Sequence, residues 1–243
     1  MKLKEAIEIL GENSSLAIAE NLANTLNIAW AAGPSVIFKA IAADNDRIPG
    51  NIGSDSDDEH AAIKKWLLKY QTGKDKRASQ RTSNPPGTVS DPMLSKIIAA
   101  RITSLSTPDL DKIISGHRLS MSAENILGLL LEEYLANNLE PHGWFCAWGE
   151  TIKSVDFVHN DGRLLQIKNR SNSENSSSSA VRSGTQIQKW YRIEATKIET
   201  KWDSLNTICG TNRLSESSFS EFVKTTLLSN PSCLAVEEDN SWQ

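Results

Sequence analysis

The hydrophobic residues between positions 3 and 43 recur every three or four residues, the spacing that places them on one face of an α-helix. Gly33 and Pro34 interrupt this pattern, and both residue types break helices. The polar run 45–59 predicts a loop, and residues 59–70 predict another amphipathic helix. The first part of the chain is therefore predicted to be a group of packed helices.

Residues 72–91 are rich in basic residues and proline, which predicts an irregular and mobile loop. The helical pattern returns at residues 92–102, and residues 107–109 are expected to cap a short helix. Ser122 is a good N-cap for a further helix that extends to about Asn138.

Strand-like patterns occupy the second half of the chain. The candidate strands are residues 144–148, 151–159 and 163–170. Residues 185–202 alternate basic with aromatic or apolar side chains, which suits either a helix or an edge strand, and residues 215–228 predict the last helix. Helices around these strands predict an α/β fold with a mixed central β-sheet flanked by helices.

The composition is that of an ordinary globular protein, with 39% hydrophobic and 23% charged residues among 243. Three cysteines without CxxC spacing indicate neither a disulfide framework nor a zinc site, so we expect a reducing compartment, the cytoplasm. The first ten residues lack the apolar core of a signal peptide, and no apolar run has the length to span a bilayer. We therefore expect no membrane association.

The net charge of −4 argues against a nucleic-acid partner, but the charge is unevenly distributed. Between Arg163 and Lys201 there are eight basic and three acidic residues. This segment therefore has an excess of five positive charges, which favours a nucleic-acid partner despite the net charge.

Residues 153–170 predict a β-hairpin with Asn160-Asp161-Gly162 as a three-residue turn. In this register Asp156 faces Gln166, and the alternation of side chains places Lys168 on the same face of the sheet. The opposite face is apolar and consists of Val155, Phe157, Leu165 and Ile167.

An acid, an amide and an amine on one sheet face suit the hydrolysis of a phosphodiester. Carboxylate and amide oxygens are ligands of Mg²⁺, which lowers the pKa of a bound water and stabilises the charge on the phosphate. An amine next to these ligands can orient or deprotonate the attacking water. The alternative is a solvated amphipathic hairpin without catalysis, and the pattern alone leaves both readings open.

The hairpin resembles the catalytic motif of the PD-(D/E)XK nuclease superfamily, with Asp156 as its aspartate and Gln166-Ile167-Lys168 as its (D/E)XK. Glu124, in the first turn of the predicted helix, matches the glutamate that a preceding helix often contributes. The resemblance implies a restriction-endonuclease-like core that uses Mg²⁺. Its implied ligands are Asp156, Gln166, the Ile167 backbone carbonyl and Glu124, and Lys168 would position the water.

The second carboxylate of this site is left open by the sequence. Gln166 carries no negative charge, so a carboxylate from outside the hairpin has to compensate. Glu124 is the first candidate, although it is equally explained as a charge that complements the helix dipole, and Glu150 is an alternative. Glu132 and Glu133, farther along the same predicted helix, are expected to be solvated.

The runs 166–177 and 182–192 are similar to the SinI-type restriction endonucleases. This finer resemblance implies a bacterial type II enzyme that cuts double-stranded DNA at a short target of the GGWCC kind (W is A or T) as a homodimer. A DNA methyltransferase would be its genetic partner, because such an enzyme endangers its host without one. The residues expected to contact DNA are Asn169, Arg170, Arg182, Ser183, Thr185, Gln186, Gln188, Lys189 and Arg192.

We accordingly assign residues 1–90 to an N-terminal helical region that supports the core, dimerises or contacts DNA, and residues 91–243 to the catalytic core. The nearest rival is a repair or recombination nuclease of the same superfamily. A DNA-binding or assembly module without catalysis is the other, and the neutral Gln166 favours it.

Overall fold

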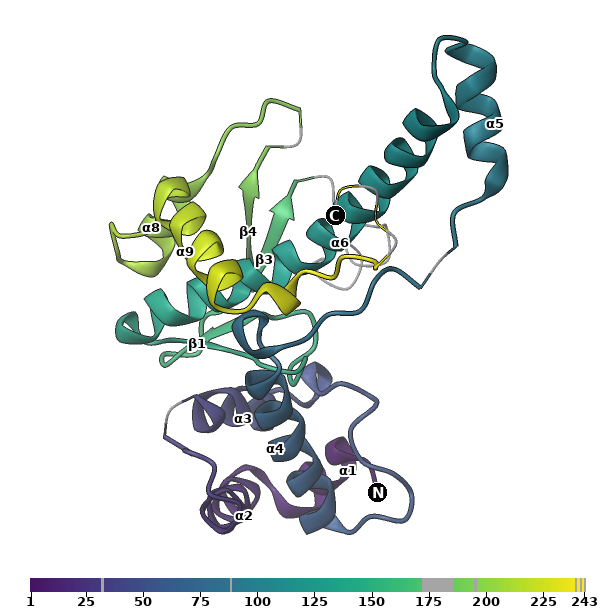
Figure 1. Cartoon of the computed structure of the whole chain (residues 1–243). Coiled ribbons are helices and arrows are strands. Elements are labelled where there is room, and N and C mark those ends of the chain that lie inside the picture. Colours follow the sequence, from purple (N-terminus) through teal and green to yellow (C-terminus); the bar gives the residue numbers. More distant parts are fainter. Residues whose placement is uncertain are drawn as a thin grey trace.

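The computed structural model describes residues 1–31, 33–87, 89–171, 186–194, 196–238, 240 and 242. In this part of the chain a four-stranded mixed sheet lies between two groups of helices, which confirms the predicted α/β class (Figure 1). The longer helices are α1 (Leu3–Leu10), α2 (Glu12–Thr25), α3 (Pro34–Ala43), α4 (Glu59–Asp75), α5 (Pro92–Arg101), α6 (Thr107–Leu139), α8 (Trp202–Cys209) and α9 (Glu216–Ser229).

The N-terminal helices form where the hydrophobic spacing predicts them, and the break at Gly33 and Pro34 is confirmed. Pro34 is the first residue of α3, a position where its missing N–H costs no helical hydrogen bond. The predicted loop that follows contains only one short 3₁₀ turn, η1 (Asn45–Arg47).

The predicted loop over residues 72–91 is only partly correct. Helix α4 continues to Asp75, and a 3₁₀ turn, η2 (Ala78–Gln80), follows it. Gly73 does not end the helix; a Cβ atom at this position would overlap the Gly149 backbone, so the glycine allows α4 to pack directly against a loop near the sheet.

The two helices predicted around residues 107–109 and 122–138 are one continuous helix, α6. Its N-terminus is capped by Ser106, whose hydroxyl and backbone exchange hydrogen bonds with Asp109. The expectation that Ser122 caps a separate helix is wrong, because Ser122 is a buried residue in the middle of α6. Helix α5 and the first half of α6 project from the body as an arm (Figure 1).

The sheet contains β1 (Trp144–Cys146), β2 (Phe157–His159), β3 (Leu164–Arg170) and β4 (Ile187–Ile193) in that spatial order. Strands β1 and β2 pair antiparallel, as do β2 and β3, whereas β4 lies parallel to β3 at the edge. Of the two structures left open for the segment 185–202, the edge strand is correct for residues 187–193.

The predicted hairpin register is confirmed. Val158 pairs with Leu164 and Phe157 with Leu165, as a turn at residues 160–162 requires. The His159 N–H donates to the Arg163 carbonyl at 2.9 Å, and Gly162 closes the turn with φ +92°.

The strand predicted over residues 151–159 is largely wrong. Only residues 157–159 are strand, because Glu150 (φ +55°) and Ser154 (φ +61°) adopt left-handed backbone conformations that no strand contains. The chain between them forms an irregular loop, and Val155 leaves the predicted face to join Val158. Alternation fails here because it holds only while the backbone stays extended.

Both faces of the sheet are buried. Val158, Leu164 and Ile187 belong to the core that includes α1–α4, whereas Phe157, Leu165 and Trp190 belong to the core around α6, α8 and α9. The exposed side chains of the sheet therefore lie at strand ends, in the loops and on the edge strand β4, where Gln188 and Lys189 are exposed. Among the described residues no helix combines the length and apolar character needed to cross a bilayer.

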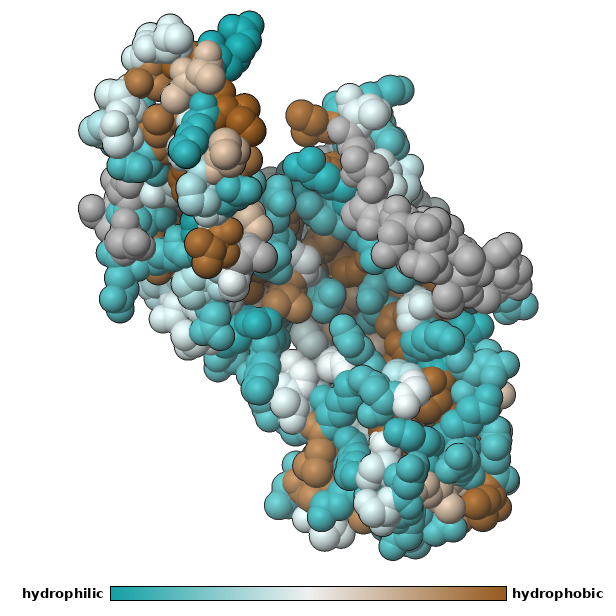
Figure 2. Space-filling model, turned by 90° about the vertical axis from the view of Figure 1, so that its right-hand side faces the viewer, coloured by the Kyte–Doolittle hydropathy of each residue, from teal (hydrophilic) through white to brown (hydrophobic). Residues whose placement is uncertain are grey.

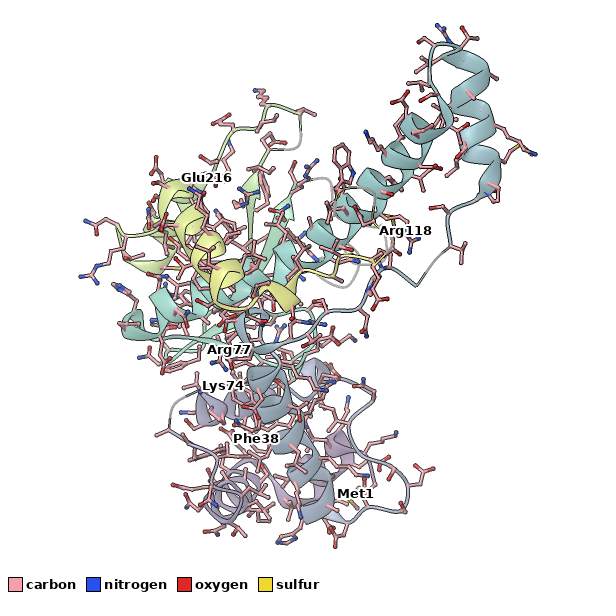
Figure 3. The ribbon with its side chains drawn as sticks, viewed as in Figure 1. Met1, Phe38, Lys74, Arg77, Arg118 and Glu216 are labelled. Carbon is pink, nitrogen blue, oxygen red and sulfur yellow. The ribbon has the colours of Figure 1, made fainter. Side chains whose placement is uncertain are left out.

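Glu133 joins α6 to the segment after α4, and its substitution should destabilise the fold. Its carboxylate is almost fully buried and accepts hydrogen bonds from Arg77 Nε at 3.1 Å and the Ser79 N–H at 2.7 Å (Figure 3 shows Arg77 at this junction). Glu133→Ala leaves both donors without an acceptor, and we expect a loss of roughly 2–4 kcal/mol in the free energy of unfolding. Urea denaturation measures it, with the exposed Glu124→Ala on the same helix as control. Equal midpoints for the two variants would contradict the prediction.

Candidate active site

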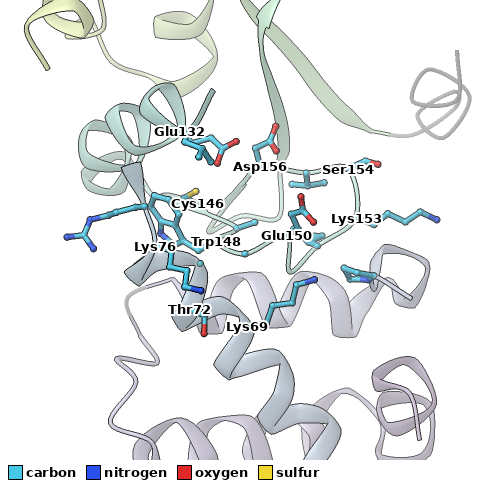
Figure 4. Close-up of a pocket in the computed structure, with 18 of the residues that line it drawn as sticks. Lys69, Thr72, Lys76, Glu132, Cys146, Trp148, Glu150, Lys153, Ser154 and Asp156 are labelled. Carbon is cyan, nitrogen blue, oxygen red and sulfur yellow. The ribbon is translucent and has the colours of Figure 1, made fainter. Parts of the chain in front are cut away.

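A cavity of about 1030 Å³ opens at the end of the hairpin. It is bounded by α4, the loop 147–156, α6 and β3, so it lies between the N-terminal helices and the sheet. Figure 4 shows Glu132, Glu150 and Asp156 on one side of it, with Lys69 of α4 and Lys76 just after α4 on the other.

Asp156 is held in place by three hydrogen bonds at the entrance to β2. Its backbone N–H donates to the Leu165 carbonyl at 3.0 Å, and its carbonyl accepts from the Ala147 N–H at 2.8 Å. One carboxylate oxygen accepts from the Ile167 N–H at 2.7 Å. The side chain is therefore fixed against β3, and the cavity lies beside it.

Glu132 of α6 is the second carboxylate in the cavity. Its pKa is raised from 4.5 to about 8, mainly by burial and in addition by the charges of Asp156 and Glu150, whereas the Lys168 ammonium opposes the shift. These four groups are therefore electrostatically coupled. At neutral pH the excess of negative charge around Glu132 is relieved by a proton, and a bound cation would relieve it equally.

The loop that carries Glu150 is built with a strained backbone. Gly149 has φ +75°, and a Cβ atom there would collide with the Lys69 carbonyl of α4. Glu150 and Ser154 adopt left-handed conformations without being glycine, which costs on the order of 1 kcal/mol each. Such strain persists where surrounding packing fixes the backbone, and here α4 provides that packing.

Lys168 and Asp156 line the cavity together, whereas Gln166 and Glu124 do not. Gln166 is buried within β3. Glu124 is exposed, and it lies eight residues before Glu132, which is about 12 Å along the helix. Since α6 begins at Thr107, Glu124 also has no role at a helix N-terminus. The explanation of Glu124 as a charge that complements the helix dipole is therefore wrong.

The expected solvation of Glu133 is wrong, because Glu133 is buried, whereas Glu132 is half-buried in the lining of the cavity. The burial of Glu133 had a signal in the sequence. Glu133 follows Ile126 and Leu130 at intervals of four and three residues, which places it in the buried row of α6. Glu132 lies beside that row, and no local pattern marks it. Its role depends on the loop 147–156 and β3 closing over it.

The residues expected to contact DNA divide into three groups. Arg192 is buried, where its Nε donates to Asn169 Oδ1 at 2.9 Å and its guanidinium pairs with Glu216, so these groups stabilise the edge of the sheet. Arg170, Gln186, Gln188 and Lys189 are exposed. Arg182, Ser183 and Thr185 lie outside the described residues.

The side chains fit a hard divalent cation in their chemistry. Mg²⁺ in proteins is typically held by one or two carboxylates, with waters and substrate phosphates completing its shell. Within the described residues no group of three His, Cys, Asp or Glu is gathered closely enough to hold a metal alone. Asp156 and Glu132 are nevertheless two carboxylates that line the same cavity. The pKa of Glu132 is raised mainly by burial and also by the negative charges of Asp156 and Glu150, and a cation would balance those charges.

A mixed sheet between helical layers, with an acid and a lysine brought together by its central hairpin, defines a restriction-endonuclease-like α/β core. The chain belongs to the SinI restriction endonuclease family, whose sequence model matches residues 44–229. It is 43% identical over 153 residues to the type II restriction enzyme Eco47I of Escherichia coli, a match that covers 61% of this chain and 66% of Eco47I. It is 41% identical over 148 residues to the type II restriction enzyme SinI of Salmonella infantis, covering 59% and 64% of the two chains. Each match thus spans just under two thirds of the relative.

Proposed function

We propose that this protein is a type II restriction endonuclease that hydrolyses phosphodiester bonds of double-stranded DNA. The observation that carries the proposal is the meeting of Asp156, Glu132 and Lys168 in one cavity of a chain from a restriction endonuclease family. Two relatives named as type II restriction enzymes support it. We expect it to act in the bacterial cytoplasm.

Mg²⁺ is the proposed cofactor, with Asp156 and Glu132 as its carboxylate ligands. Two neutral oxygen donors directly precede Lys168 on β3. They are the Gln166 amide and the Ile167 backbone carbonyl. When bound, the metal lowers the pKa of a coordinated water and stabilises charge on the phosphate. Glu132 thus replaces Glu124 as our candidate for the second carboxylate.

The protein's own groups position the reaction. The Ile167 N–H holds one oxygen of Asp156, so the carboxylate cannot rotate away from the cavity. Lys168, the residue after Ile167 on β3, donates hydrogen bonds to the attacking water or to a phosphate oxygen and offsets negative charge. The products would be 5′-phosphate and 3′-hydroxyl ends.

The proposed target is GGWCC, as in the SinI-type resemblance. Arg170, Gln186, Gln188 and Lys189, which are exposed on and beside β3 and β4, are the described candidates for DNA contacts. Arginine, lysine and glutamine side chains can read guanine and adenine edges in the major groove. A DNA methyltransferase of the same specificity would protect the host, so methylated target DNA should resist cleavage.

Digestion of a sequenced plasmid tests the proposed function. With Mg²⁺ we expect discrete fragments whose ends map to one short target, and none with EDTA. Unspecific degradation would instead support a repair or recombination nuclease. DNA binding without cleavage in Mg²⁺ or Mn²⁺ would support a module without catalysis.

We further propose that the protein is a homodimer held together by the arm. Six large hydrophobic residues between positions 89 and 113 are exposed, and α5 has no buried residue (Figure 2 shows hydrophobic side chains on the arm at upper left). Such a concentration of apolar surface marks an interface, and a second copy matches a nearly palindromic target. The residues are Val89, Met93, Leu94, Ile97, Ile102 and Ile113.

Charge placed on the arm should therefore separate the subunits. Ile97 is 60% exposed, and Ile97→Asp puts a carboxylate into the proposed interface. We expect the dissociation constant of the dimer to rise at least tenfold in sedimentation equilibrium. Ile9→Asp, at an equally exposed isoleucine outside the arm, should leave it unchanged. A monomeric wild type would contradict the proposal.

A further inference from the structure

The cavity at the catalytic hairpin is strongly basic, although the chain as a whole is acidic. Its lining contains seven basic residues and only three acidic ones, an excess of four positive charges in a chain whose net charge is −4. The three acids are Asp156 and Glu132 of the proposed metal site, together with Glu150. Most of the positive charge comes from α4 and the segment that follows it, and Lys153 of the loop 147–156 adds to it.

Helix α4 arranges part of this charge in a row. Lys65 and Lys69 are four residues apart, so they share the face of α4 that borders the cavity, and Lys76 lines the same cavity from the C-cap of the helix. Lys65 pairs with Asp57 at 2.6 Å, and Lys69 donates to Asn51 at 3.2 Å. Among the described residues, Lys76 and Lys153 form no ion pair. Lys153 lines the cavity from the loop 147–156 (Figure 4).

Arg81 gives an independent indication of an anionic ligand. It lines the same cavity, and its Nε is buried with no hydrogen-bond acceptor among the described residues. A buried donor of a cationic group without an acceptor is costly, so such groups are normally satisfied. A phosphate oxygen entering the cavity would satisfy it, and guanidinium groups suit phosphate geometry.

We propose that this cavity is a channel for the DNA phosphate backbone, in which Lys76, Lys153 and Arg81 bind phosphates next to the scissile one. The inference rests on the proposed function and extends it, because it makes α4 of the N-terminal region one wall of the active cleft. It also resolves the conflict between an acidic chain and a polyanionic substrate. These contacts hold phosphate, so they strengthen binding to every sequence equally.

The test compares two doubly substituted proteins, both in an Asp156→Asn background that prevents cleavage. Lys76→Ala/Lys153→Ala removes two channel residues, and Lys64→Ala/Lys224→Ala removes two exposed lysines outside the cavity. Fluorescence anisotropy measures binding of labelled duplexes with and without GGWCC over a range of salt concentrations. Thermal denaturation verifies that both proteins are folded.

The channel variant should bind both duplexes about tenfold more weakly, with the ratio between them unchanged and the slope of log K against log salt reduced by about 2. The control variant should retain its affinity and slope. Equal slopes for both variants would overturn the channel while leaving the nuclease proposal intact. Loss confined to the GGWCC duplex would overturn it too, since base contacts would then be involved. Failure of the wild type to cut plasmid tests the proposed function separately.

Discussion

Asp156→Asn should reduce the rate of DNA cleavage by at least about 10³-fold, because removal of one preorganised charge from a site of this kind has effects of that size. Asparagine keeps an oxygen that can accept the Ile167 N–H, so the loop and β3 should keep their arrangement. Only the negative charge toward the cavity is lost. The effect should therefore appear as a loss of metal-dependent cleavage in a protein that is still folded.

Single-turnover cleavage of a duplex at saturating protein measures this loss. Asp161→Asn is the matched control: it is the same substitution in the same hairpin, at an exposed turn residue outside the cavity. It should leave the rate within about twofold of wild type, as surface substitutions generally do. Cleavage by Asp156→Asn at the control rate would show that the catalytic site is elsewhere.

Glu132→Gln should lower cleavage by roughly 10²–10³-fold and at the same time stabilise the metal-free protein at alkaline pH. The pKa of Glu132 is raised in the folded protein from 4.5 to about 8. Below pH 4.5 the group is neutral in both states and costs nothing. As the pH rises from 4.5 to 8 the unfolded chain loses the proton first, so stability falls, and the penalty is complete above pH 8.

The predicted change in stability is measured by urea denaturation in EDTA at pH 5 and pH 9. Glutamine removes the penalty, so the variant should be more stable than wild type by on the order of 3 kcal/mol at pH 9 and nearly equal at pH 5. Added Mg²⁺ should stabilise the wild type at pH 9 and the variant much less, because a bound ligand stabilises only the state that binds it.

Glu124→Gln provides the decisive comparison, since it makes the same change on the same helix at an exposed position. It should alter neither cleavage nor the pH dependence of stability. If Glu124→Gln abolishes cleavage and Glu132→Gln does not, the second carboxylate is the one suggested by the motif, and the cavity described here is not the metal site.

The hairpin was predictable in detail because its determinants are local. The Asn160-Asp161-Gly162 turn fixes which residues face one another, and a glycine at the left-handed position closes it. Alternation then places Asp156 opposite Gln166 and leaves Lys168 two positions farther along β3. The SinI-type resemblance, which rested on the runs 166–177 and 182–192, is confirmed by the family match.

The errors lie where local patterns compete with packing. Residues 151–156 have the composition of a strand, but the close contact of Gly149 with α4 bends the chain into a loop with two strained residues. Similarly, Ser122 has the form of an N-cap, but a capping box at Ser106 starts the helix sixteen residues earlier, and nothing after it breaks the helix. In each case the conformational preference of the local residues contributes less free energy than the packing and helix continuity around them.

The α/β class, the turn and register of the hairpin, and the acid and lysine of the candidate site could be inferred from the residues alone. These follow from side-chain periodicity and turn chemistry, which act over a few residues. The presence of Glu132 in the same cavity, and of α4 lysines on its far wall, follows from the packing of distant segments. Those groups lie 24 or more residues from Asp156 in the chain, and their meeting depends on the sheet being buried between two helical layers.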